Sequence, residues 1–243
     1  PKLRTGEVAD DGTKRPGIRL SPGDELIVTG DGRPGLRGGS TGPARIPCTL
    51  PRIAADVEVG HRIFFDDGEI GGVIEAIDGE DLRVRITRTR PGGKKLRADK
   101  GINLPDSHLD VPALSDDDLS TLDFAADRAD LVGLSFVRTP EDIALLHHHL
   151  CERTGRDLGV VLKIENHEAF ENLPSLLLAG LRQPPLGVMV ARGDLGVELG
   201  FERMAEVQEQ ILWLAEAAHV PVIWATQVLE QMNKTGMPTR SEV

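Results

Sequence analysis

The apolar positions of the first hundred residues fall in short segments that glycine and proline separate. Over residues 82–87 apolar and polar side chains alternate, which predicts a strand with one buried and one solvated face. Residues 24–29 predict a second strand, and residues 61–65 lead into a turn at residues 66–68, whose glycine can take a positive φ. Short strands and frequent turns indicate a small antiparallel β domain, of which a barrel is one form.

From about residue 101 the pattern changes, and helices alternate with buried strands. Strands that are buried on both faces, as in a parallel sheet, are predicted over residues 130–137, 159–165, 188–191 and 220–225. Helices are predicted between them, the longest over residues 202–219, and Ser115 and Thr139 are start signals for two others. A βαβα series of this kind predicts an α/β fold with right-handed crossovers.

Polar side chains gather where these strands end, namely Ser135, Lys163, Glu165, Asp194 and Thr226. In a (β/α) barrel such positions face the active site. Lys163 and Glu165 are two residues apart on one strand, so we expect both side chains on the same face. Burying either is costly unless it is paired or binds a metal, which itself indicates a site. Taken alone, the segment 187–198 also allows an ordinary exit from strand to loop with a solvated Asp194.

These residue types indicate a particular chemistry. Glu165 and Asp194 would supply the two carboxylates that Mg²⁺ or Mn²⁺ commonly takes. Lys163 would neutralise a phosphoryl group, and Thr226 offers a hydroxyl for proton relay or ligand binding. Gly193 permits close approach of the backbone, so its N–H and that of Asp194 can bind an anion. The combination favours phosphoryl transfer or stabilisation of an enolate.

The composition of the chain limits the classes of partner that it can bind. The 243 residues are 40% apolar and 28% charged, which is typical of a soluble globular protein, and no apolar run is long enough for a membrane span. The formal net charge of −11 argues against nucleic acid or an anionic membrane as a partner, while a few local cations could still bind an anionic substrate. Cys48 and Cys151 have no metal-binding spacing and indicate a reducing, cytoplasmic location.

One dense basic stretch leaves two interpretations open. It consists of Arg88, Arg90, Lys94, Lys95, Arg97 and Lys100. These side chains either form a solvated hairpin end around the turn at residues 91–93, or form a cationic edge that faces a phosphate.

Eight segments resemble the motifs of pyruvate kinases in order and spacing. They are PKLRTG at 1–6, DDG at 66–68, KGINLP at 100–105, LSFVR at 134–138, KIENHE at 163–168, MVARGDLGVE at 189–198, ATQVLE at 225–230 and PTRSE at 238–242. The resemblance implies a (β/α)₈ TIM-type barrel, incomplete here, with an inserted all-β, barrel-like lid domain. Residues 1–7 would be a barrel strand, 8–97 the lid, and 98–243 the barrel segment that carries the active site.

The resemblance also implies an activity, the transfer of a phosphoryl group from phosphoenolpyruvate to ADP, which gives pyruvate and ATP with Mg²⁺ or Mn²⁺ in the last step of glycolysis. By motif, the catalytic residues would be Lys163 and Thr226, and the metal ligands Glu165 and Asp194. The substrate would contact Gly193, Asp194, Thr226 and Ser135, and the nucleotide Arg4, Lys100 and Asp66. We expect the chain to be an internal piece, barrel strands three to seven, which could be inactive by itself.

One position bears on monovalent cations. In the family, the residue after the proline of the strand-three motif is Glu in K⁺-dependent members and Lys in K⁺-independent ones. Here it is Lys2, so its ammonium is the expected substitute and K⁺ is not expected to be required. The full-length protein is expected to be a homo-oligomer.

Two alternatives remain. One is a non-catalytic or regulatory homologue, which retention of Lys163, Glu165, Asp194 and Thr226 disfavours. The other is a different barrel enzyme that binds phosphoenolpyruvate or pyruvate, of the aldolase or phosphomutase type, which the nucleotide lid disfavours.

Overall fold

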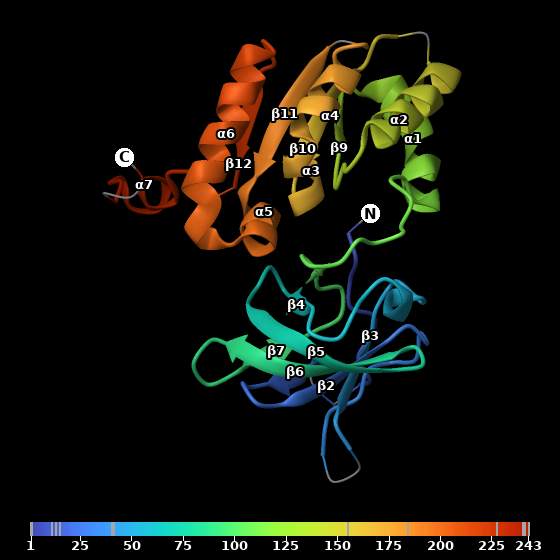
Figure 1. The fold of residues 1–243 in the computed structure, drawn as a ribbon, viewed down its shortest axis with the longest axis vertical. Helices are drawn as coiled ribbons and strands as arrows, with labels where there is room; N and C mark the ends of the chain where they lie inside the picture. The colour runs from blue at the N-terminus through green and yellow to red at the C-terminus, as the bar shows by residue number, and fades with distance from the viewer. Residues whose placement is uncertain are drawn as a thin grey trace. The chain divides into compact units, whose positions relative to one another are not determined.

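The computed structural model describes residues 2–10, 12, 14, 16–39, 42–154, 156–183, 185–226, 228–239 and 242. The chain forms two compact units, Pro1–Pro112 (unit 1) and Ala113–Val243 (unit 2), and each is described by itself (Figure 1). Four positions of the motifs in the sequence, Pro1, Gln227, Arg240 and Ser241, lie outside the described residues.

Unit 1 is built from strands. Its elements are β1 (Ile18–Leu20), β2 (Glu25–Thr29), β3 (Ala44–Pro47), the 3₁₀ turn η1 (Ile53–Ala55), β4 (Arg62–Phe65), β5 (Ile70–Asp78), β6 (Asp81–Thr89), β7 (Lys94–Leu96) and β8 (Ile102–Asn103). Six strands form one sheet in the order β3-β2-β6-β5-β4-β8, and β1 pairs with β7 in a separate antiparallel ribbon.

The alternation predicted for β6 is confirmed. Leu82, Val84 and Ile86 are buried in the core of unit 1, and the residues between them are more exposed. The β sheet differs from the prediction in one respect, because β2 and β3 are parallel. Parallel neighbours need a crossover connection rather than a tight turn, and the irregular segment between these two strands provides one.

Unit 2 alternates helices and strands. Its elements are α1 (Asp116–Arg128), β9 (Leu131–Leu134), α2 (Pro140–Arg153), β10 (Gly159–Ile164), α3 (His167–Glu171), α4 (Leu173–Gly180), β11 (Leu186–Ala191), α5 (Arg192–Leu199), η2 (Phe201–Arg203), α6 (Met204–Ala217), β12 (Val222–Ala225) and α7 (Glu230–Thr235). The four strands are parallel, in the order β12-β11-β10-β9.

This sheet is the α/β barrel-like part of the fold (Figure 1). The core of unit 2 lies between the sheet and the helices. Buried strand residues such as Leu162, Val188 and Val190 share it with helix residues such as Leu146 and Ile211. Because the strands are parallel, their carboxyl ends meet at one edge of the sheet. The polar residues identified in the sequence lie at or just after these ends.

The predicted helix starts are confirmed. Ser115 accepts a hydrogen bond from the Asp118 N–H and forms a capping box with it, and Thr139 precedes Pro140 at the start of α2. None of the helices in the described part of the chain has both the length and the apolarity that a membrane crossing requires.

The prediction for β9 is wrong in its extent and burial. A buried strand was predicted over residues 130–137, whereas β9 spans Leu131–Leu134 and Leu131 is 59% exposed. The exposure of β9 follows from its position, because β9 is the last strand of the sheet and has only β10 as a neighbour. One face of an end strand is poorly covered even when its residues are apolar.

Candidate active site

The end of β10 holds a lysine and a glutamate side by side. Lys163 Nζ lies 2.9 Å from Glu165 Oε1 and donates a 2.6 Å hydrogen bond to Ser135 Oγ. The Glu165 side chain is only 4% exposed and that of Lys163 27% exposed. A buried carboxylate needs an ionic or hydrogen-bonded partner, and Lys163 supplies one. The expectation that both side chains point to one face is confirmed.

Phe136 holds Glu165 from the neighbouring strand end. Its backbone N–H donates a 2.7 Å hydrogen bond to Glu165 Oε2. Phe136 has a φ of 53°, a left-handed conformation that is uncommon for a bulky residue. Such conformations persist where surrounding contacts hold them, and they are frequent at functional sites. The ends of β9 and β10 are thus joined through Ser135 and Phe136.

The strand β11 passes directly into helix α5, because the strand ends at Ala191 and the helix begins at Arg192. Gly193 and Asp194 therefore lie in the first helical turn and not in a loop. The first N–H groups of an α-helix have no acceptor within the helix, and the helix dipole is positive at this end. The N-cap residue of α5, Ala191, makes no side-chain cap hydrogen bond. Gly193 is exposed and Asp194 half-buried, a geometry that favours an anion at the end of β11.

Arg192 links α5 to the end of β12. Its Nη2 donates a hydrogen bond to the carbonyl oxygen of Thr226, and its Cζ lies 5.5 Å from the centroid of the Trp224 ring. Thr226 is exposed and has a φ of 63°, which is strained for a β-branched side chain. Arg192 therefore restrains the backbone from which the Thr226 hydroxyl projects.

Two carboxylates of unit 2 fit a divalent cation. Lys163 is in register with Met189, so Glu165 and Asp194 follow neighbouring strands at the same edge of the sheet. A carboxylate has about four lone-pair sites, and the ammonium of Lys163 and one backbone N–H contact the carboxylate of Glu165. Mg²⁺ commonly takes one or two carboxylates and keeps several waters. Within the described ranges no group of three or more His, Cys, Asp or Glu side chains could hold a metal ion, so waters and substrate oxygens would complete the shell.

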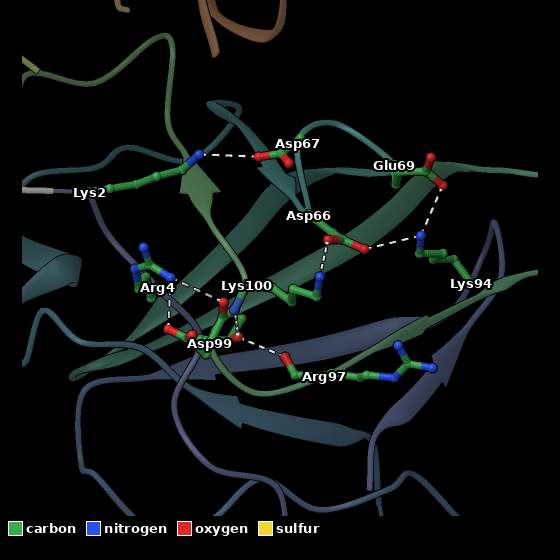
Figure 2. A network of polar contacts seen from close by, with 10 residues as sticks. Lys2, Arg4, Asp66, Asp67, Glu69, Lys94, Arg97, Asp99 and Lys100 are labelled. Carbon is green, nitrogen blue, oxygen red and sulfur yellow. Dashed lines mark hydrogen bonds and ion pairs between the residues drawn. The ribbon is translucent and has the colours of Figure 1, made fainter. Parts of the chain in front are cut away.

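A second cluster lies in unit 1, around Asp66 (Figure 2). Lys100 Nζ lies 2.8 Å from Asp66 Oδ1, and Lys94 Nζ lies 3.1 Å from Asp66 Oδ2 and 3.1 Å from Glu69 Oε2. Burial raises the pKa of the Asp66 carboxyl, but the two ammonium groups outweigh it and hold this pKa below its ordinary value. Asp66 is therefore ionised and binds both lysines.

Lys2 and Arg4 also contact acidic residues (Figure 2). Lys2 Nζ lies 3.1 Å from Asp67 Oδ1, and Arg4 Nη1 lies 2.8 Å from Asp99 Oδ1. The acidic side chains are exposed, by 69% and 78% respectively. Exposed ion pairs contribute only about 0–1 kcal/mol, so Arg4, whose side chain is 48% exposed, can exchange Asp99 for a phosphate at little cost.

The residues predicted for the site thus fall into two groups. In unit 2 the structure joins Ser135, Lys163 and Glu165, and it places Gly193, Asp194 and Thr226 at or after the ends of the next two strands. In unit 1 it joins Asp66 with Lys100, and it pairs Lys2 and Arg4 with other acids. Sequence reasoning missed Phe136, whose backbone N–H holds Glu165, and Arg192, whose side chain holds the Thr226 carbonyl oxygen. It also did not foresee that Lys94 holds Asp66.

An α/β barrel-like sheet with a lysine–carboxylate pair, a second carboxylate and an uncapped helix start at its strand ends is typical of enzymes that bind anionic substrates. Comparison with known proteins narrows this class. The sequence matches the family profile "Pyruvate kinase, barrel domain" over residues 1–243. The chain belongs to the pyruvate kinase family.

Individual relatives agree with this assignment. The chain is 36% identical over 243 residues, 100% of its length, to a pyruvate kinase of Mycobacterium tuberculosis, and covers 47% of that protein. It is 40% identical over 199 residues, 82% of its length, to a pyruvate kinase of Mycobacterium intracellulare, and covers 40% of it. It is 35% identical over 243 residues, again 100% of its length, to the human pyruvate kinase PKLR, and covers 40% of it. The chain therefore spans less than half of the length of these curated relatives.

Proposed function

We propose that this chain carries catalytic residues of a pyruvate kinase, which transfers a phosphoryl group from phosphoenolpyruvate to ADP. The observation that carries the proposal is the bonded group of Ser135, Lys163 and Glu165 at the carboxyl ends of β9 and β10. A lysine ammonium held against a buried glutamate at this edge of an α/β sheet would stabilise the negative charge of a phosphoryl group during its transfer.

In the proposed reaction, the bond between phosphorus and the enol oxygen of phosphoenolpyruvate breaks as a terminal phosphate oxygen of ADP bonds to phosphorus. The ammonium of Lys163 offsets negative charge on the phosphoryl group in transit and on the enolate left behind. A proton is then added to the enolate carbon to give pyruvate, and the Thr226 hydroxyl would relay it through water. Ser135 keeps the ammonium directed at this edge through its 2.6 Å bond.

The substrate carboxylate would bind to the start of α5. The N–H groups of Gly193 and Asp194 lie in a helical turn without a side-chain cap, and this end of a helix attracts anions. Thr226 would add its hydroxyl to the same carboxylate. Arg192 supports this role because it holds the Thr226 carbonyl oxygen.

Glu165 and Asp194 are the proposed ligands of Mg²⁺ or Mn²⁺. The cation would neutralise phosphate charge and orient the transferred group. Arg4, Lys100 and Asp66 are proposed to contact the nucleotide. Because Asp66 binds both Lys94 and Lys100, its part would be to hold these lysines in position rather than to touch phosphate itself.

The remaining expectations from the sequence belong to this proposal. Residues 8–97 would be a lid inserted between a barrel strand at 1–7 and a barrel segment at 98–243. The ammonium of Lys2 would replace K⁺. The protein would act in the cytoplasm as a homo-oligomer.

Replacing Lys163 with methionine tests the proposed function. In the complete gene product, K163M should lower kcat for pyruvate formation by about 10²–10³ in an assay coupled to lactate dehydrogenase. Lys234→Met is a matched control, since Lys234 is a 58% exposed residue of α7 paired with Glu230; it should keep the rate within about twofold. An unchanged rate in K163M would refute the role of Lys163. Wild-type protein without any activity would favour a non-catalytic homologue.

A further inference from the structure

The turn between β4 and β5 carries Asp66 and Asp67 in an uncommon backbone conformation. Both residues are left-handed, with φ of 54° and 55°, and Gly68 follows with a φ of 80°. Aspartate tolerates this conformation better than most residues, but two in succession need contacts that hold the turn. Left-handed residues other than glycine concentrate at active sites and ligand clamps.

Arg88 of β6 holds this turn by two contacts at once. Its Nη2 donates a 3.0 Å hydrogen bond to the carbonyl oxygen of Gly68, and its Cζ lies 5.6 Å from the centroid of the Phe64 ring. A guanidinium over an aromatic face is attracted by the ring and kept in one orientation. Arg88 belongs to the basic stretch that the sequence left open between a solvated hairpin end and a phosphate-facing edge, and its contacts are of a third kind.

Gly71 makes room for this arrangement. It is directly opposite Phe64 in the antiparallel pair of β4 and β5, and directly opposite Arg88 in the pair of β5 and β6. A Cβ on Gly71 would lie 3.1 Å from Phe64 Cε1, closer than ordinary van der Waals contact. Because the middle strand has a glycine here, the ring and the guanidinium of the two outer strands can meet across it.

The turn directs two carboxylates at cations that the proposed function uses. Asp66 pairs with Lys100, and Asp67 pairs with Lys2 (Figure 2). The backbone N–H of Asp66 also donates to the carbonyl oxygen of Gly101 at 3.0 Å. A change in the conformation of the turn would therefore move Asp66 and, through its carboxylate, the ammonium of Lys100.

We propose that Arg88 is a positioning residue for the nucleotide site. It holds the carbonyl oxygen of Gly68 and so fixes Asp66, which in turn fixes Lys100. The inference rests on the proposed function for the role of Lys100, whereas the link from Arg88 to Asp66 rests on the geometry of the turn. Since Arg88 would act through the turn, its loss should weaken the binding of ADP and leave the bond-breaking step at the strand ends of unit 2 unchanged.

Steady-state kinetics of the complete gene product tests this role. Arg88→Met should raise the KM for ADP about five- to tenfold, a part of what the loss of a charge-assisted hydrogen bond costs, while kcat and the KM for phosphoenolpyruvate stay within about twofold. Arg88→Lys keeps a cation over the Phe64 ring and should restore most of the affinity for ADP. Arg90→Met is the matched control, because it removes the same charge from an exposed position of the same basic stretch, and it should leave all three constants unchanged.

Three outcomes would overturn the inference and leave the proposed function, which K163M tests, intact. The first is an unchanged KM for ADP in Arg88→Met. The second is a fall in kcat together with equal rises in both KM values, which would mean general damage to the fold. The third is an equal rise in Arg90→Met, which would mean that only the total positive charge matters.

A second measurement does not depend on the activity. In urea unfolding at pH 7, Asp66→Asn should lower the equilibrium constant for folding several-fold less in the Arg88→Met background than in wild type, because the turn no longer holds the carboxylate against its lysines. Equal effects in the two backgrounds would show that Arg88 does not position Asp66, and would overturn the inference even in a protein without activity. The same curves show whether each variant is folded.

Discussion

Replacing Glu165 with alanine should destabilise the protein far more than removal of an exposed acidic residue. The backbone N–H of Phe136 donates to Glu165 Oε2 at 2.7 Å, and an unsatisfied buried donor costs about 1–3 kcal/mol. Lys163 loses its ion pair but keeps its hydrogen bond to Ser135, and its side chain is 27% exposed. Solvent therefore screens the lost ion pair, which contributes about 1 kcal/mol to the destabilisation. The sum, about 2–4 kcal/mol, is a large share of the roughly 5–15 kcal/mol that stabilises a typical protein.

Urea unfolding followed by circular dichroism measures this difference, provided that the slope against denaturant is unchanged. Glu165→Gln should cost less than Glu165→Ala, because the amide oxygen can still accept the Phe136 hydrogen bond. Glu206→Ala is the control, since this 53% exposed side chain pairs with Arg203 and such pairs contribute about 0–1 kcal/mol. Equal losses in the Glu165→Ala and Glu206→Ala variants would show that the buried contacts of Glu165 do not stabilise the fold.

Two other expectations concern unit 1. The pKa of Asp66 is below its ordinary value in the folded protein, so its stabilising effect is present above the unfolded pKa, about 3.9, and is lost as pH falls through the folded pKa. Asp66 has a left-handed backbone, with a φ of 54°, which asparagine also tolerates. Asp66→Asn should therefore be less stable than wild type at pH 7, and the difference should shrink towards pH 3 in urea titrations. A constant difference would contradict this. Lys2→Glu should make pyruvate formation depend on added KCl, whereas wild type should not respond; equal responses would argue against Lys2 as the substitute cation.

The sequence predicted much of this structure because its strongest signals are local. Alternation over residues 82–87 specified β6, and the cap at Ser115 specified the start of α1. The spacing of Lys163 and Glu165 placed both side chains on one face, where the structure pairs them. Each of these signals depends on neighbours a few residues away, so one sequence is enough to read them.

The features that the sequence did not predict depend on distant contacts or on backbone conformation. Arg192 binds the carbonyl oxygen of a residue 34 positions away, and no pattern near Arg192 indicates this. The left-handed Phe136 is a bulky residue for which such a conformation is rare. The exposure of β9 follows from its place in the sheet order, which single-strand hydrophobicity does not encode.

The direct passage from β11 into α5 has a consequence for the changes of length that this junction can accept. Ala191 is the last strand residue and Arg192 the first helical one, so no loop residue absorbs an insertion or deletion. One added residue would rotate the following helix by about 100° relative to the sheet, since a helix turns once in 3.6 residues. Asp194 would then leave the edge where Glu165 lies. A substitution at this junction would change the side chains of the site, whereas an insertion or deletion would move Asp194 away from Glu165.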